Sequence, residues 1–106
     1  MGLLRYQLEN GDIPITLWLK SLRDVRAKAQ VQIRFKRVEA GNFGDHKAVG
    51  EGVCELRVDI GAGYRIYYGQ HGKTLVVLLC GGDKATQPAD IKLAKEYWAD
   101  WKRKNS

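Results

Sequence analysis

An alternating stretch at Val53–Gly69 constrains the fold of this chain more than any other feature. Every second residue of its first half is apolar, and Glu55, Arg57 and Asp59 stand between them. This alternation is typical of a strand with one buried and one exposed face. Gly61–Gly63 interrupts the pattern, and a second alternating run follows. The stretch therefore predicts an antiparallel hairpin.

The polar face of this hairpin carries groups that suit an anion. On the second strand, Arg65 and Tyr67 share one face. If Arg57 of the first strand lies on the same side, the hairpin presents two guanidiniums and a phenol together to solvent. Arginine grips phosphate oxygens in a fork, so this face indicates binding of a phosphate-bearing partner.

Length and charge set the outer limits of the prediction. The chain of 106 residues is long enough for one small domain, residues 1–106, and too short for two. Its formal charge of +6 favours polyanions such as nucleic acid, although many small proteins are basic without binding one. No Cys/His cluster has zinc spacing, and no signal peptide or membrane-spanning window is present. We therefore expect a cytoplasmic protein with no metal and no cofactor, in which Cys54 and Cys80 are free thiols.

The N-terminal part predicts a strand and then a pair of helices. Leu3–Leu8 is expected to form a short strand at a sheet edge. Asp12 is the expected cap of the first helix, with Pro14 in its first turn. Asp24 is expected to begin the second helix, and Gly41 occupies the position where a helix end favours a left-handed residue.

The second helix has an apolar line and a basic side. Val25, Ala29 and Ile33 form the expected apolar line. Arg34 and Arg37 belong to a basic side that either contacts nucleic acid or is a solvated face.

A polar loop, a buried strand and a last helix complete the chain. The loop contains His46, which is either a solvated side chain or an acid/base group, and Lys47, which begins a possible short strand. Thr74–Cys80 is apolar on both faces and predicts a central strand covered on one side by helices and on the other by neighbouring side chains. Lys84 follows at the rim of the sheet, and Pro88 starts the last helix. The predicted fold is α+β: an N-terminal strand, a helical hairpin, an antiparallel sheet and a C-terminal helix.

At this point the ordered motifs resemble a known family. Its residues here are Gly41–Lys47, Gly52–Arg57, Gly63–Tyr68, Leu78–Gln87 and Asp90-Ile91 followed by Ala94 and Tyr97-Trp98. The set resembles toxins of type II toxin–antitoxin modules in the RelE/ParE superfamily, with the phage-type, HigB-like killer proteins as the most similar branch. The resemblance runs from about Ile13 to Asp100.

The resemblance implies a compact RelE-type domain, a cognate antitoxin that forms a hetero-oligomer with the toxin, and ribosome-dependent cleavage of messenger RNA. Arg57, Arg65 and Lys84 match basic positions that bind and stabilise phosphate in the RNA-cleaving members. The C-terminal tyrosine of some ribonuclease members has no clear match. ParE-like members share the fold but act on gyrase, so gyrase poisoning stays an alternative, as does a non-catalytic basic binding module.

An RNA-cleaving site needs cations and a route for protons. RNA supplies its own nucleophile, the 2′-hydroxyl, so an endoribonuclease of this kind needs no metal. Proton-transfer candidates are His46, Glu55, Tyr67 and Tyr68, although Tyr67 could instead stack on a base and Glu55 could simply pair with an arginine. The candidates for RNA contact are Lys47, Arg34, Arg37 and Tyr68, the last of which the alternation also assigns to packing.

Overall fold

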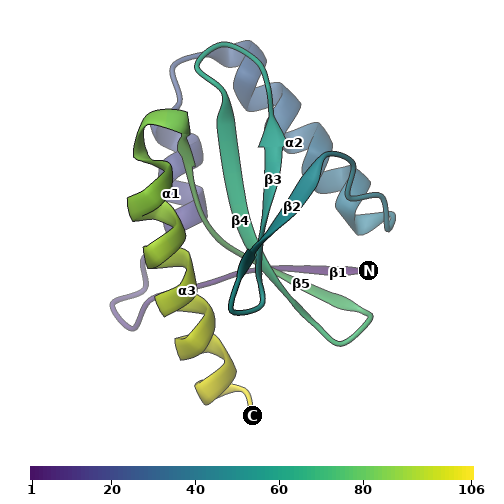
Figure 1. Ribbon diagram of the computed structural model, residues 1–106, viewed down its shortest axis with the longest axis vertical. Helices are drawn as coiled ribbons and strands as arrows, with labels where there is room; N and C mark the ends of the chain where they lie inside the picture. The colour runs from purple at the N-terminus through teal and green to yellow at the C-terminus, as the bar shows by residue number, and fades with distance from the viewer.

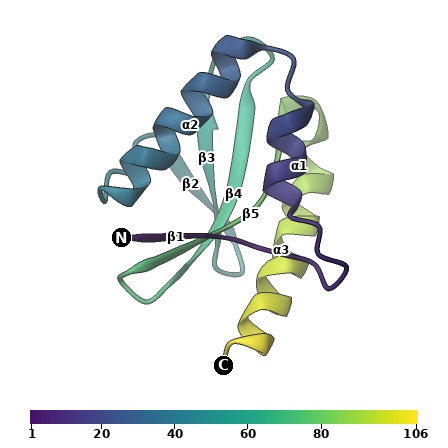
Figure 2. The same cartoon turned by 180° about the vertical axis from the view of Figure 1, so that it is seen from behind.

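The structure, a computed structural model, describes residues 1–106 as one α+β domain with a five-stranded sheet (Figures 1 and 2). The strand order across the sheet is β1-β5-β4-β3-β2. The elements are β1 (Gly2–Arg5), α1 (Pro14–Ser21), α2 (Val25–Glu39), β2 (His46–Gly50), β3 (Val53–Val58), β4 (Tyr64–His71), β5 (Leu75–Asp83), the 3₁₀ turn η1 (Lys84–Thr86) and α3 (Gln87–Lys104). The predicted fold class and order of elements are confirmed.

The sheet is mixed, because its first strand runs parallel to its neighbour. Strands β2 to β5 pair antiparallel, as the sequence predicts, but β1 pairs parallel with β5, with Leu3 opposite Val76. A parallel pair needs a long connection, and here both helices and three strands separate the two strands in the chain. The N-terminal strand does lie at a sheet edge, as expected.

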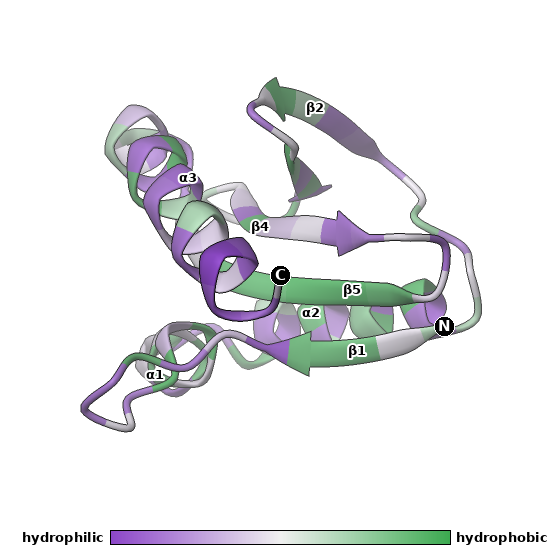
Figure 3. Cartoon of the chain, turned by 90° about the horizontal axis from the view of Figure 1, so that it is seen from below, coloured by the Kyte–Doolittle hydropathy of each residue, from purple (hydrophilic) through white to green (hydrophobic).

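Helices cover both faces of the sheet, which gives two core layers. Helices α1 and α2 pack on one face over Leu56, Ile66 and Leu78, and α3 packs on the other over Tyr67 and Leu79. Figure 3 shows the strongly hydrophobic β5 between the two helical layers. The expectation that helices cover this strand on one side only is therefore wrong.

The helix α1 begins as the sequence predicts but is not capped by Asp12. Its first residue is Pro14, and the N-cap residue Ile13 makes no side-chain hydrogen bond. Instead Asp12 belongs to the preceding turn, where its backbone amide donates to the side-chain oxygen of Asn10 at 2.9 Å. The carboxylate of Asp12 accepts a hydrogen bond from the side-chain amide of Asn10 at 3.3 Å, so it is turned to this loop and not to the helix.

The helix α2 has the predicted ends and a different buried face. The side chain of Asp24 accepts hydrogen bonds from two amides of the first turn, and Gly41, at φ 89°, ends the helix. The predicted apolar line is wrong, because Val25 is 79% exposed and Ile33 is 41% exposed. The buried line is instead Ala27, Val31, Phe35 and Val38. Both lines have helical spacing, and burial of the large Phe35 ring decides between them.

The hairpin of β3 and β4 is confirmed, and its register fixes the faces. Arg57 pairs with Arg65 and Glu55 pairs with Tyr67 across the two strands. Because directly opposed residues point to the same face, all four side chains lie on the α3 side of the sheet. The last helix lies close to this side at Gly69, where an added Cβ would overlap the indole of Trp98.

Candidate functional site

Two arginines stand directly opposite each other on the α3 face of the sheet. Arg57 near the end of β3 and Arg65 near the start of β4 are Cα partners in the antiparallel register. The sequence predicts this shared face, and the structure confirms it. Two like charges opposed on adjacent strands repel each other unless counterions lie beside them.

The counterion of Arg57 is an exposed carboxylate. Its guanidinium lies 2.8 Å from Asp45, and the exposed fractions of the two side chains are 34% and 48%. The backbone amide of Arg57 also donates to the carbonyl of Asp45 at 3.0 Å. The pair is therefore held at the rim of the sheet, where solvent and a ligand can reach it.

Arg65 is buried, which the sequence does not predict. Its side chain is 8% exposed and lies 3.1 Å from Asp59, whose own side chain is 60% exposed. The guanidinium also donates to the carbonyl of Tyr64, while Nε has no partner. The expectation that the hairpin presents Arg65 to solvent is wrong, because β4 is a central strand flanked by β3 and β5.

Tyr67 is fully buried and its hydroxyl has no hydrogen-bond partner. Burial raises the pKa of the Tyr67 hydroxyl far above its ordinary value, and the carboxylates of Glu55 and Asp90 raise it further. A phenol that keeps its proton is a hydrogen-bond donor and a poor base. The expectation that Tyr67 is a solvent-facing phenol able to stack on a base is wrong for this conformation, since the ring packs under α3.

Glu55 is buried beside these groups, and its hydrogen-bond partner is a residue that no sequence motif marks. The carboxylate, in a residue that is 2% exposed, accepts a hydrogen bond from the side chain of Gln87 at 2.9 Å. No ion pair joins Glu55 to Arg57 or Arg65, so the expected cross-strand pairing is wrong. Gln87 is the first residue of α3, and no local spacing in the sequence points from it to β3, 32 residues earlier.

Lys84 lies at the sheet rim, as predicted, and packs on the turn of the hairpin. Its backbone amide donates to the carbonyl of Gly63 at 3.1 Å. A Cβ added at Gly63 would lie 2.7 Å from Cε of Lys84, so glycine leaves the room that the lysine stem occupies. Since Arg65 pairs with Gly82, the lysine follows two residues after the partner of the buried arginine.

The strand register places His46 on the opposite face of the sheet from the arginines, and Lys47 on the same face as the arginines. His46 pairs with Leu56 and so belongs to the opposite face, where its ring lies 5.7 Å from that of Phe43. Lys47 pairs with Glu55 and is exposed on the same face as Arg57. The structure thus brings Lys47, and not His46, to the side of the arginine pair.

Arg34 and Arg37 have different surroundings on α2. Half-buried Arg34 donates hydrogen bonds to the backbone carbonyls of Arg57, Phe43 and Asp45, at 2.6, 2.9 and 2.9 Å. Burial lowers the pKa of the Arg34 guanidinium, and nearby Asp45 partly offsets this. Arg34 therefore has a structural role, because it links α2 to β3 and to the loop before β2, whereas Arg37 is exposed.

Three of these arginines, Arg34, Arg37 and Arg57, line a shallow groove. Its volume is about 450 Å³, and its lining also includes Asp45 and Asp59. The exposed groups of this groove are the ones that a phosphate could reach first.

Tyr68 belongs to the core and not to this surface. It is 3% exposed, and its ring stacks on Phe43 at a centroid distance of 5.5 Å. Burial raises the pKa of its hydroxyl, as does the Cys54 thiol. The prediction that Tyr68 contacts RNA is therefore wrong, and the packing alternative is confirmed.

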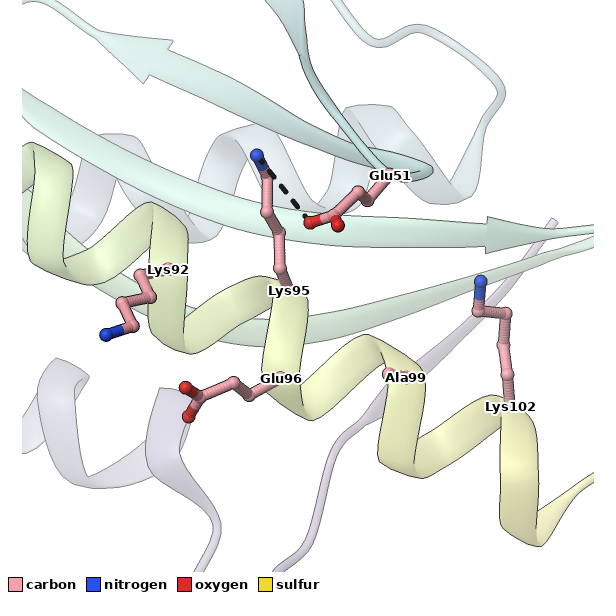
Figure 4. A pocket seen from close by; sticks show the side chains of 6 residues that line it. All are labelled: Glu51, Lys92, Lys95, Glu96, Ala99 and Lys102. Carbon is pink, nitrogen blue, oxygen red and sulfur yellow. Dashed lines mark ion pairs between the residues drawn. The ribbon is translucent and has the colours of Figure 1, made fainter.

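A second basic groove lies beside α3 (Figure 4). Three lysines at helical spacing, Lys92, Lys95 and Lys102, line a space of about 590 Å³ together with Glu51, Glu96 and Ala99. Lys95 reaches Glu51 at 3.7 Å, as Figure 4 shows. The two carboxylates offset much of the lysine charge here.

Neither metal ligands nor a membrane-spanning helix is found. No three His, Cys, Asp or Glu side chains are grouped so that they could hold a metal ion. None of the helices has the length and apolar character needed to cross a membrane. Cys54 and Cys80 are free thiols, as predicted, and burial raises the pKa of Cys80 to about 12.

Fold and site together define a small basic α+β protein in which a mixed sheet, covered by helices on both faces, carries an arginine pair between surface carboxylates. No family model matches the chain. The chain is 55% identical over 78 residues to a protein of Haemophilus influenzae (strain ATCC 51907 / DSM 11121 / KW20 / Rd) named "Uncharacterized protein", a match that covers 74% of this chain and 79% of that one. The chain therefore belongs to the same family as this Haemophilus protein.

Proposed function

We propose that this protein is the toxin of a type II toxin–antitoxin module and that it cleaves messenger RNA on the ribosome. The observation that carries the proposal is the direct pairing of Arg57 with Arg65 on one face of the sheet. Two guanidiniums on directly opposed residues of adjacent strands can bind neighbouring oxygens of a sugar-phosphate backbone. The proposal also implies a cytoplasmic protein that a cognate antitoxin neutralises.

The residues of this face, together with Lys84 at the rim of the sheet, divide into those that stabilise charge and those that handle protons. Arg57, Arg65 and Lys84 offset the charge that develops on the scissile phosphate. The Tyr67 hydroxyl, whose pKa is raised by burial, serves as a hydrogen-bond donor. Glu55 is the carboxylate on this face that can accept the proton of the 2′-hydroxyl, and Gln87 holds it in place.

Binding of RNA requires that its phosphates displace the carboxylates of Asp45 and Asp59 from the arginines. Asp45 and Asp59 occupy the positions on Arg57 and Arg65 that phosphate oxygens would take. Both aspartates are about half exposed or more, so they regain hydration when a phosphate replaces them. Arg65, Glu55 and Tyr67 must also become accessible, since each of these residues is at most 6% exposed.

The test is expression of the wild type, Arg57→Ala and Arg65→Ala, with growth measurement and mapping of transcript ends. We expect the wild type to stop growth and to cut transcripts at codon-spaced positions, and each variant to lose about 10²–10³ in cleavage rate. Arg26→Ala, an exposed arginine at the start of α2, is the matched control. Circular dichroism of the purified variants shows whether they are folded.

Three results would contradict the proposal. Intact transcripts in cells that contain the folded wild type would exclude RNA cleavage. DNA damage signalling with stalled gyrase complexes would instead indicate a gyrase poison, and absence of toxicity with reduced binding in Arg65→Ala would indicate a basic binding module.

A further inference from the structure

The helix α2 has a second apolar line, which lies at the surface of the protein. One line, from Ala27 to Val38, is buried in the core. The other contains Val25, Ala29 and Ile33, all of them exposed, at a spacing of four residues. Residues four apart lie above one another on a helix, so this line is a continuous stripe of two turns.

The stripe borders a groove between α2 and the edge strand β1. The groove has a volume of about 480 Å³ and is lined by Ala29 and Ile33 of the helix and Leu3 and Arg5 of the strand, among others. Figure 2 shows β1 crossing below α2, with the free edge of the sheet beside it. An apolar groove with an open side accepts a helix that lays its own apolar line into it.

The charged side chains around the groove are mostly basic, and this favours an acidic partner. Arg5 and Lys36 stand at its sides, and Glu39 is the one acidic residue in its lining. Over its whole length α2 has five basic residues and one acidic residue. An acidic occupant is therefore attracted, and another basic surface is repelled.

We propose that this groove binds an acidic, amphipathic helix of a partner protein, with apolar residues of that helix against Ala29, Ile33 and Leu3 and its carboxylates beside Arg5 and Lys36. A second copy of this chain fits less well, because the same basic side chains would face each other. RNA fits less well, because the stripe offers aliphatic side chains and no aromatic ring for base stacking.

The groove is separate from the arginine pair. Arg34 and Arg37 of α2 turn toward β3, whereas Ile33 and Lys36 line the groove beside β1. The inference about the groove does not depend on RNA cleavage. That the partner is the antitoxin rests on the proposed function, so the test below uses no RNA.

The probe is a synthetic peptide of about 14 residues, about four helical turns, with leucines four apart and glutamates on both flanks. A scrambled peptide of the same composition has the same charge without the apolar line. Binding is measured by fluorescence anisotropy, and the contact surface is mapped by NMR amide shifts. We expect the scrambled peptide and the Ile33→Asp variant to weaken binding by about tenfold or more. Leu93→Asp, at an exposed leucine of α3, is the matched control and should bind normally.

Three results would overturn the inference. Equal binding of the two peptides would show attraction by charge alone. Amide shifts centred on Arg57 and Arg65 would place the acidic peptide on the other surface. A dimer in sedimentation that Ile33→Asp converts to a monomer would show that a second copy covers the stripe.

Discussion

The guanidinium of Arg34 donates a hydrogen bond of 2.6 Å to the backbone carbonyl of Arg57, and its other nitrogen reaches the carbonyls of Phe43 and Asp45. One side chain from α2 thus ties together the end of β3 and the loop before β2. Asp45 in turn holds the guanidinium of Arg57. Arg34 therefore contacts Arg57 only at the backbone. It influences the arginine pair by fixing the loop that contains Asp45.

Replacement of Arg34 should lower stability, and replacement of Arg37 should not. Arg34→Ala removes three hydrogen bonds, two of them to the partly buried carbonyls of Arg57 and Phe43, so we expect a loss of about 2 kcal/mol or more in the free energy of unfolding. Arg37→Ala removes an exposed cation from the last turn of the same helix and should cost about 0.5 kcal/mol. Urea denaturation measures both. Equal effects of the two substitutions would contradict the assignment of Arg34 as a structural tie.

Removal of the carboxylate beside Arg65 should strengthen RNA binding. Asp59→Asn keeps the size of the side chain and removes the charge that competes with phosphate, so we expect a gain of about 0.5–1 kcal/mol, or two- to fivefold in affinity at low salt. Asp12→Asn makes the same change of charge in the N-terminal turn and serves as control. Anisotropy with a labelled single-stranded RNA gives the dissociation constants. If both variants gain equally, net charge alone explains the effect.

High pH should destabilise the protein from about pH 9 upward. Burial raises the pKa of Cys80 from 9.0 to about 12, so the unfolded thiol ionises first and the folded state loses stability between these two values. The slope is at most about 1.4 kcal/mol per pH unit for this group. Tyr67 and Tyr68 also have raised pKa values and add to the loss above pH 10.

The contribution of Cys80 can be isolated with one variant. Cys80→Ala should lower stability at neutral pH and make the loss of stability between pH 9 and 10 smaller, because only the tyrosines, whose ordinary pKa is 10.0, then begin to ionise in the unfolded state. Urea denaturation at pH 8, 9 and 10 gives the comparison. An unchanged slope in the variant would show that another group titrates in that interval.

Local signals in the sequence predict local structure well here. Asp24 and Gly41 mark the ends of α2 because capping depends on a few adjacent residues, and the alternation of β3 and β4 gives both the hairpin and the shared face of Arg57 and Arg65. The buried face of α2 is not predictable in this way, because the line through Ile33 has the same spacing as the buried one.

The surroundings of the candidate site depend on contacts that are distant in the chain. The charge pattern does not show that Asp59 pairs with Arg65, or that Gln87 reaches Glu55. Arg34 looks like any other cation of a basic helix, and only its position against β3 makes it structural. Burial of Tyr67 follows from the placement of α3, which no short motif specifies.

Gly82 determines how closely the start of α3 approaches β5. A Cβ at this position would overlap the carboxylate of Asp90, which accepts a hydrogen bond from the hydroxyl of Thr86 at 2.5 Å. Gly82→Ala should therefore displace the first turn of α3 and lower the free energy of unfolding by about 1–3 kcal/mol. Since Gly82 pairs with Arg65, the displacement should also increase access to the buried guanidinium.

A double substitution tests the cause of this effect. Asp90→Ala removes the overlapping carboxylate, so the double variant should be more stable than the sum of the two single losses predicts, by about 1 kcal/mol. Strict additivity would show that the alanine acts through the backbone of β5 and not through Asp90. The reactivity of Arg65 toward phenylglyoxal reports its exposure and should rise in Gly82→Ala and return toward the wild-type value in the double variant.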